Sequence, residues 1–347
     1  MRIAIVTDAW APQLNGVVRT LTALRDELER RGHEVLVVSP DLFRSIPCPS
    51  YPEISLALAG ASAIGKLLRD FGPNAVHIST EGPLGLAARR YCLSNGLCFT
   101  TAYHTHFPDY LAKRTRLPSA LFWPFIRWFH RPSSGILVAT ESVARQLRAQ
   151  GLTQTRPWSR GVDLAQFGPD IMPPDLFLKL KRPIQLYVGR VAVEKNIEAF
   201  LAARHEGSKV VVGDGPALAK LQAEFPEVHF VGRQTGDALT ACYAGADVFV
   251  FPSHTDTFGL VMIEALACGT PVAAFPVTGP LDVLDDRSGA MDPDLSVAIS
   301  RALELDRRDC LERGRSFGWK QSTDQFLAAL APVPQHQTAH GFRPQPA

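Results

Sequence analysis

A repeated alternation of short apolar runs with amphipathic segments constrains the fold of this chain more than any other feature. In the first half, four runs are almost wholly apolar or β-branched, at residues 3–7, 34–39, 75–79 and 98–103, and an amphipathic segment spans residues 17–31. Runs of this kind, separated by helical segments, are typical of parallel strands that are buried on both faces. The first half therefore predicts an open parallel sheet with helices on both sides.

The same alternation begins again after residues 168–175, a loop rich in Pro, Gly and Asp that suits a hinge. Strands are expected at residues 184–188, 209–212, 228–231, 248–251 and 271–274, and helices at 195–203, 217–225, 237–244 and 259–267. Two doubly wound units in one chain place the ligand site between them, at the carboxyl ends of the strands. We therefore expect an α/β protein with two Rossmann-like domains facing each other across a cleft, at residues 1–172 and 173–331, followed by a disordered tail at 332–347.

Composition excludes several classes of protein. With 46% apolar residues, 20% charged residues and a net charge of +2, the chain is typical of a globular protein and lacks the charge excess that nucleic-acid binding favours. No apolar run approaches the roughly 18 residues of a membrane span, and the first one is too short for a signal peptide. The six cysteines contain no CxxC pair, which favours reduced thiols in the cytoplasm.

Cations follow the strand expected at residues 184–188. Gly189 and Arg190 come directly after it, and Lys195 opens the next helix. Two cations beside a helix N-terminus, at the carboxyl end of a parallel strand, suit a diphosphate. Taken alone, they are equally well explained as solvated surface residues.

The next strand ends in a tight loop, Gly213-Asp214-Gly215-Pro216. Glycine there allows a ligand to approach the backbone, although most such tetrapeptides are simple turns. The loop is a stronger candidate for a binding site because it lies at the same expected sheet edge as Arg190 and Lys195.

The most informative stretch follows the strand expected at residues 248–251. Asp256 lies before a helix whose start, at Phe258, Gly259 and Leu260, offers backbone N–H groups to a phosphate. Glu264 lies further along, among apolar residues. A routine helix cap explains Asp256, but a carboxylate in an apolar helix requires a partner.

Asp256 and Glu264 resemble the carboxylate–seven residues–carboxylate motif of the retaining glycosyltransferases of family 4, which have the GT-B fold. With Asn15-Gly16-Val17, Gly189 to Lys195 and the 213–216 loop, the resemblance covers essentially the whole chain. Residues 103–106, 158–163 and 191–196 are similar to a subgroup of α-mannosyltransferases and glycolipid synthases related to sulfoquinovosyl-diacylglycerol synthase. The family's first carboxylate is usually Glu, and Asp256 is one methylene shorter.

This resemblance implies roles for individual residues. Glu264 would hold the nucleotide ribose, Arg190 and Lys195 the diphosphate, and Asp256 the donor sugar. His104 would lie near the anomeric carbon. The residues implied in catalysis are His104, Asp256, Arg190 and Lys195, and those implied in donor binding are Gly16, Gly189, Gly213, Asp214, Gly215, Thr257, Phe258, Gly259, Leu260 and Glu264.

We expect no metal and no cofactor other than the nucleotide sugar, which is a co-substrate. His104 and His106 alternate as metal ligands can, but no third ligand lies at useful spacing. Asp292-Pro-Asp294 has the letters of a metal-binding DxD, but it is most simply a turn that starts a helix.

The acceptor is inferred from the segment Leu111 to Arg131, in which basic residues interleave with aromatic and aliphatic ones. Such a segment suits a membrane interface, and it suits a core helix with a solvated cationic face equally well. The resemblance to lipid-synthesising enzymes favours the membrane, hence a protein peripheral on the inner face of the cell membrane. It also suggests that a proline-rich loop at residues 46–54 borders the acceptor channel.

The sequence thus predicts a retaining α-glycosyltransferase that moves a hexose from GDP-mannose or a UDP-sugar to a membrane lipid such as diacylglycerol. One alternative keeps this donor chemistry with a soluble or oligosaccharide acceptor. Another is a sugar-nucleotide epimerase, which needs no acceptor.

Overall fold

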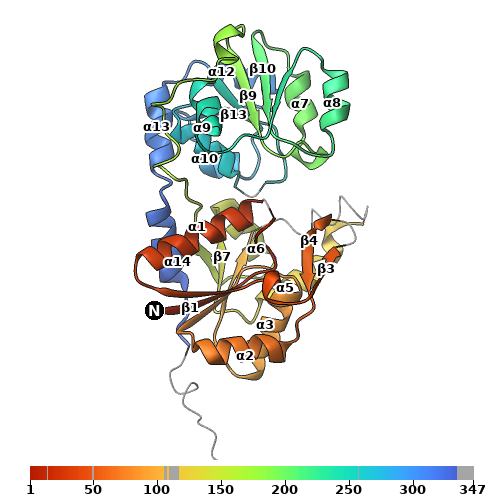
Figure 1. Cartoon of the computed structure of the whole chain (residues 1–347), viewed down its shortest axis with the longest axis vertical. Coiled ribbons are helices and arrows are strands. Elements are labelled where there is room, and N and C mark those ends of the chain that lie inside the picture. Colours follow the sequence, from red (N-terminus) through yellow and green to blue (C-terminus); the bar gives the residue numbers. More distant parts are fainter. Residues whose placement is uncertain (14, 49–50, 105–107, 109–116, 257, 334–347) are drawn as a thin grey trace, which may run out of the picture. The chain divides into compact units, whose positions relative to one another are not determined.

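The computed structural model describes residues 1–333 apart from 14, 49–50, 105–107, 109–116 and 257 (Figure 1). It divides into two compact units. Unit 1 comprises Met1–Ser159 together with the chain from Thr323 onward, and unit 2 comprises Arg160–Ser322.

Unit 1 is built on a six-stranded sheet with the order β2-β1-β5-β6-β7-β8, and every adjacent pair is parallel. Its strands are β1 (Arg2–Val6), β2 (Glu34–Val38), β5 (Ala75–Ile78), β6 (Thr100–Tyr103), β7 (Gly135–Val138) and β8 (Thr155–Pro157). Its helices are α1 (Gly16–Arg30), α2 (Ala61–Phe71), α3 (Pro83–Ser94), α5 (Trp123–His130) and α6 (Glu141–Ala149). The sheet is therefore the doubly wound parallel sheet expected from the sequence.

Alternating residues of β1 enter two separate cores. Ile3 and Ile5 pack with the apolar face of α1 and with Phe326 of α14 (Trp319–Ala329). Ala4 and Val6 pack on the other face of the sheet, with residues of α2 and α3. Figure 1 shows these helix pairs on opposite sides of the sheet. Burial on both faces explains why this strand has no polar alternation.

Local signals set the ends of α1. The Asn15 side chain accepts hydrogen bonds from the backbone N–H groups of Val17 and Val18, both at 3.0 Å, and so caps the helix. Gly32, just beyond the helix, has a left-handed φ of 79°. Both signals agree with the sequence-based boundaries.

Unit 2 contains a second six-stranded parallel sheet with the order β11-β10-β9-β12-β13-β14. Its strands are β9 (Ile184–Val188), β10 (Ser208–Val212), β11 (His229–Gly232), β12 (Val248–Phe251), β13 (Val272–Ala274) and β14 (Gly289–Met291). Its helices are α7 (Ile197–Ala202), α8 (Leu218–Glu224), α9 (Gly236–Gly245), α10 (Leu260–Ala267), α11 (Pro280–Val283), α12 (Leu295–Ala302) and α13 (Arg307–Arg315), and a 3₁₀ turn, η4, spans Val193–Lys195.

In both sheets the strand order reverses once, because later strands are added on the other side of the first strand. In unit 1 the reversal lies between β1 and β5, and in unit 2 it lies between β9 and β12. In open α/β sheets, ligands bind outside the carboxyl ends of the strands at such a switch point. Each unit therefore has one edge at which a ligand site is expected.

Unit 2 begins and ends earlier than the expected second domain, at Arg160 and Ser322 instead of residues 173 and 331. Residues 160–172 belong to unit 2, because Phe167 packs edge-on against Tyr243 of α9 with ring centroids 6.0 Å apart. The chain from Thr323 belongs to unit 1, because Phe326 is fully buried in its core. The expected tail lies outside the described residues except for Pro332, which bridges to Ala75, and Val333.

Several local expectations are corrected. Residues 46–54, expected as a proline-rich loop, fall largely in an antiparallel hairpin of β3 (Ser45–Cys48) and β4 (Tyr51–Ala57). The helix expected at 195–203 begins later, because Asn196 has a left-handed φ of 52° that separates η4 from α7. Strands β7, β8 and β14 were not predicted, although the apolar run of β7 is readable in the sequence.

We predict that Phe326→Ala destabilises unit 1 by about 3–5 kcal/mol, because it leaves a cavity in the core shared with α1. Calorimetric unfolding of the full chain measures the change. Gln321→Ala, at an exposed position of the same helix, serves as the control and should change stability little. Equal effects of the two substitutions would contradict the placement of α14 in this core.

Candidate active site

The candidate donor site lies at the carboxyl edge of the unit 2 sheet. Strands β10, β9 and β12 are neighbours there, so the loops that follow them lie side by side. The β9 and β10 loops are joined by a hydrogen bond from Val191 N to Asp214 O at 2.9 Å. The β9 and β12 loops are joined by one from Thr255 Oγ1 to Glu194 O at 3.2 Å. Tertiary hydrogen bonds thus combine three sequence motifs into one surface.

Gly213 is required by this packing. Its φ is 145°, and a Cβ atom there would lie 1.9 Å from the carbonyl oxygen of Gly189. A Cβ atom on Gly215 would lie 2.4 Å from the carbonyl oxygen of Val191. The glycines of the β10 loop therefore serve first to let the two loops touch, and the resulting surface carries Arg190 and the exposed Asp214.

Lys195 and Asp256 form an ion pair at this edge. Lys195 Nζ lies 2.6 Å from Asp256 Oδ1, and the two side chains are 30% and 24% exposed. The sequence assigned these residues to different parts of the donor, whereas the structure pairs them directly. Asp256 Oδ2 is buried and has no hydrogen-bond partner within the described parts of the chain. One carboxylate oxygen is thus held by the lysine while the other can accept a further hydrogen bond.

Arg190 is exposed at the end of β9, and a hydrogen bond holds its backbone carbonyl. The hydroxyl of Tyr187 donates to Arg190 O at 2.8 Å. Burial raises the pKa of Tyr187, and the nearby charges of Asp256 and Glu194 raise it further. The phenol therefore stays neutral and remains a donor.

The start of α10 is shaped to meet an anion. Gly259 precedes the helix with a φ of 83°, and a Cβ there would lie 2.9 Å from both Phe251 Cζ and Met262 Cε. Among the described residues, no side chain caps the helix at this residue. The N–H of Met262 donates to Gly259 O at 3.0 Å, so the N–H groups of Leu260 and Val261 are the candidates for binding an anion. Phe258 is buried beside them, and Thr257 lies outside the described residues.

Glu264 is buried in α10, with only 2% of its surface exposed. The hydroxyl of Tyr243, from α9, donates to Glu264 Oε2 at 2.9 Å. This supplies the partner that an acid among apolar residues requires. Sequence reasoning missed Tyr243, because a single phenol in a mostly apolar helix is a weak signal.

The two sequence-predicted residues of unit 1 lie at the carboxyl edge of its own sheet. Gly16 is the exposed first residue of α1, after β1. His104 follows β6, and its ring lies edge-on to Trp158 with centroids 5.5 Å apart. His106 lies outside the described residues.

Asp8, at the end of β1, was also missed by the sequence reasoning. Its carboxylate accepts hydrogen bonds from Leu84 N at 2.8 Å, from Gly85 N at 3.3 Å and from Thr80 Oγ1 at 2.7 Å. Burial raises the pKa of Asp8, although these hydrogen bonds favour its ionised form. The residue joins the β1 loop to the start of α3.

No group of three or more metal-ligating side chains occurs within the described residues. Asp294 accepts a hydrogen bond from Ser296 N at 2.8 Å and caps α12, which confirms that the 292–294 segment starts a helix. Metal independence stays a prediction.

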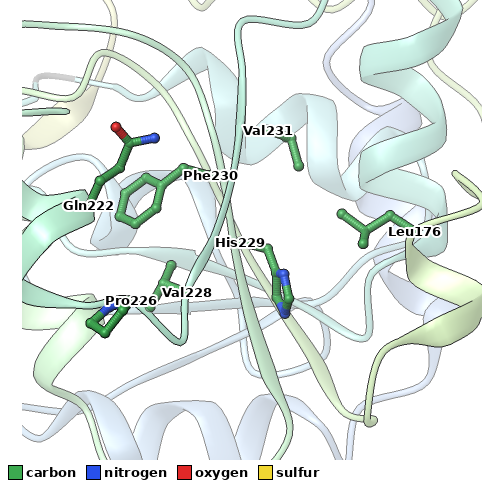
Figure 2. A pocket seen from close by; sticks show the side chains of 7 residues that line it. All are labelled: Leu176, Gln222, Pro226, Val228, His229, Phe230 and Val231. Carbon is green, nitrogen blue, oxygen red and sulfur yellow. The ribbon is translucent and has the colours of Figure 1, made fainter. Parts of the chain in front are cut away.

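A hollow of about 370 Å³ lies beside the edge strand β11 and is shown in Figure 2. Its lining is Leu176, Gln222, Pro226, Val228, His229, Phe230 and Val231. It contains no lysine or arginine and lies toward the amino end of β11. A diphosphate site requires cations and is expected at the carboxyl edge, so this hollow is not the donor site.

Helix α5 supplies most of the described part of the basic and aromatic segment. Its inner face, with Ile126 and Phe129, is buried in the unit 1 core, whereas Trp128 is 51% exposed. The guanidinium of Arg89 stacks on the Trp128 ring at 3.9 Å and donates to Trp128 O at 2.7 Å. The described part of the segment therefore has a buried core face and an exposed cationic face, and contact with a membrane stays a prediction.

A hollow of about 800 Å³ adjoins that exposed face. It is lined by Arg89, Pro124, Arg127, Trp128, Arg131, Pro132, Gln150, Gly151 and Leu152. Within the described ranges, no helix combines the length and the apolar character needed to cross a bilayer.

Comparison with known proteins agrees with this geometry. The sequence pattern of the family described as Glycosyltransferase Family 4 matches residues 14–166, and that of Glycosyl transferases group 1 matches residues 182–304. The chain is 33% identical to a GDP-mannose-dependent alpha-mannosyltransferase of Mycolicibacterium smegmatis, covering 82% of each chain. It is 30% identical to an alpha-monoglucosyldiacylglycerol synthase of Streptococcus pneumoniae, covering 87% of this chain and 78% of the relative.

Among solved structures, a sucrose-phosphate synthase from Thermosynechococcus elongatus has the same fold. Its TM-score is 0.77 at 22% identity, and the match covers 94% of this chain and 97% of that one.

We predict that Tyr243→Phe lowers the free energy of unfolding of unit 2 by about 1.5–3 kcal/mol, because a buried carboxylate loses a hydrogen bond. Urea denaturation measures the loss. Tyr187→Phe is the matched control, since it removes a hydroxyl that bonds to a neutral carbonyl, and it should cost about 0.5–1.5 kcal/mol. An unchanged unfolding midpoint in Tyr243→Phe would contradict the role of this bond.

Proposed function

This chain belongs to glycosyltransferase family 4 and is a glycosyltransferase, and we propose that it transfers mannose from GDP-mannose to a hydroxyl of a membrane lipid, with retention at the anomeric carbon. A UDP-linked hexose is the alternative donor. The GDP-mannose dependence of the mannosyltransferase relative supports the donor proposal, and the similarity to an alpha-monoglucosyldiacylglycerol synthase supports the acceptor proposal.

The observation that carries the proposal is the cationic carboxyl edge of the unit 2 sheet. Arg190 and Lys195 follow β9, and the start of α10 follows β12, the strand beside it. Departure of a nucleoside diphosphate leaves negative charge on its phosphates. Fixed cations and helix N–H groups stabilise that charge, which is usually the largest contribution to such a reaction.

Asp256 and Glu264 then have distinct roles. The Oδ2 atom of Asp256 lacks a partner among the described residues and suits a donor-sugar hydroxyl. Glu264 is oriented by Tyr243 and suits the ribose. His104, at the edge of the unit 1 sheet, would donate a hydrogen bond to the sugar near the anomeric carbon. The protein's own cations take the place of a divalent metal, so we infer that transfer needs none.

We infer that the exposed face of α5 contacts the bilayer. Trp128 offers an aromatic surface, and Arg127 and Arg131 line the hollow beside it. Aromatic and cationic side chains together suit the head-group region of an anionic membrane. We therefore propose that the enzyme is peripheral at the inner face of the cell membrane.

A soluble acceptor and epimerisation are the competing proposals. Transfer to an oligosaccharide would not require vesicles. An epimerase would form its product from the donor alone. Neither possibility accounts for the exposed Trp128 beside two arginines.

The donor proposal predicts that Lys195→Ala weakens GDP binding about 10- to 100-fold, because a charge-assisted contact to phosphate is worth about 1.5–3 kcal/mol. Glu264→Ala should weaken it as well, through loss of the ribose contact. Titration calorimetry with GDP and UDP measures both effects. Lys181→Ala, an exposed lysine paired with Glu206, is the control. If GDP and UDP both fail to bind the wild-type protein, the donor proposal is wrong.

The membrane proposal predicts that Arg127→Glu reduces binding to phosphatidylglycerol vesicles at least several-fold, since each basic residue near an anionic surface contributes about 1 kcal/mol. Cosedimentation measures the bound fraction. Lys66→Glu makes the same charge change at an exposed position of α2 and should have a smaller effect. Equal losses would show attraction by net charge alone and would contradict a contact through α5.

A further inference from the structure

Glu81 occupies the central position of the unit 1 edge. It follows β5, and β5 lies between β1 and β6 in the sheet. The loop after β1 leads to Gly16, and β6 is followed by His104. In the order of the strands, Glu81 therefore lies between the two residues of unit 1 that the sequence assigned to the donor. It also lies at the switch point, where ligands of such sheets bind.

A buried histidine holds the Glu81 carboxylate. His130 Nε2 lies 3.2 Å from Glu81 Oε1, and His130 Nδ1 lies 2.9 Å from Thr101 Oγ1. His130 is fully buried, and the Glu81 side chain is 15% exposed. A carboxylate only accepts hydrogen bonds, so His130 Nε2 is the donor in the contact with Glu81. The contacts from Thr101 through His130 hold one carboxylate oxygen of Glu81 in place.

Polar atoms remain open in the same loop. The contact with His130 engages Glu81 Oε1, and the Glu81 side chain is 15% exposed, so the carboxylate is accessible to a ligand. Ser79, two residues earlier, is 1% exposed, and its Oγ has no partner among the described residues. Buried polar atoms without partners are costly and mark places where a ligand or water completes the hydrogen bonding.

A hydroxyl group matches these open atoms. A carboxylate only accepts hydrogen bonds, so it binds a group that donates, and it repels a phosphate or another carboxylate. A hydroxyl that donates to Glu81 keeps its oxygen lone pairs free. This is the state that an attacking oxygen needs when it forms a bond to the anomeric carbon.

We propose that Glu81 binds and orients the acceptor hydroxyl, with His130 as its positioning residue. The proposal rests on the glycosyltransferase function above and adds the residue that binds the reacting hydroxyl of the acceptor. The alternative is that the Glu81–His130 contact only joins α5 to the β5 loop.

The test is Glu81→Gln, in which the amide keeps the shape of the side chain and can still accept from His130. Transfer from GDP-mannose is measured with phosphatidylglycerol vesicles containing diacylglycerol and phosphatidylinositol. Slow hydrolysis of GDP-mannose is measured in the same samples without these acceptors. We expect kcat/KM for the acceptor to fall about 10- to 100-fold, while GDP affinity, donor hydrolysis and melting temperature stay unchanged. Asp70→Asn, an exposed carboxylate on α2, is the matched control.

Unchanged acceptor kinetics in Glu81→Gln would overturn the proposal. So would a parallel loss of GDP binding, hydrolysis and thermal stability, which is the pattern of a purely structural contact. A second variant, His130→Gln, should lower kcat/KM for the acceptor without changing GDP affinity, and the opposite pattern also counts against the proposal. A wild-type protein that binds no nucleotide and hydrolyses no donor would refute the proposed function itself, which is a different result.

Discussion

The parallel pairing of β9 with β10 on one side and β12 on the other is the constraint on which the candidate donor site depends. Parallel strands end at the same edge, so three loops that are distant in sequence become neighbours. Their contact is close enough that a single Cβ atom at Gly213 would collide with the backbone of Gly189. The cations and the α10 start are therefore presented by a rigid surface, which is what preorganised charge stabilisation requires.

Within that surface, the carboxylates are already partnered before any ligand is considered. Lys195 holds one oxygen of Asp256. Glu264 lies in α10 and is held by Tyr243 of α9. Pairing reduces the cost of keeping charge in a partly buried place and limits the orientations of each carboxylate. In unit 1, Glu81 is held in the same way by His130. Three acids are thus each restrained by a neighbour from another element.

Much of this could be predicted from the sequence because the signals are local. Continuous apolar runs give buried parallel strands, Asn15 and Gly32 give the ends of α1, and Gly259 marks the start of α10. The missed features were of two kinds. Strands β7, β8 and β14 are runs of only three or four residues, and the sequence pattern did not predict them. The partners of the acids, Tyr243 and His130, lie 21 and 49 residues from them, and no local pattern records such contacts.

The sequence by itself determined the class of fold, the edges that carry the loops, and the residue types available for binding a diphosphate, because periodicity and turn chemistry act over a few residues. Only the tertiary structure decided that Lys195 pairs with Asp256, that the chain beyond Thr323 returns to unit 1, and that Glu81 is held at the centre of its sheet edge. These depend on which strands become neighbours, and strand order is a property of the whole folded unit.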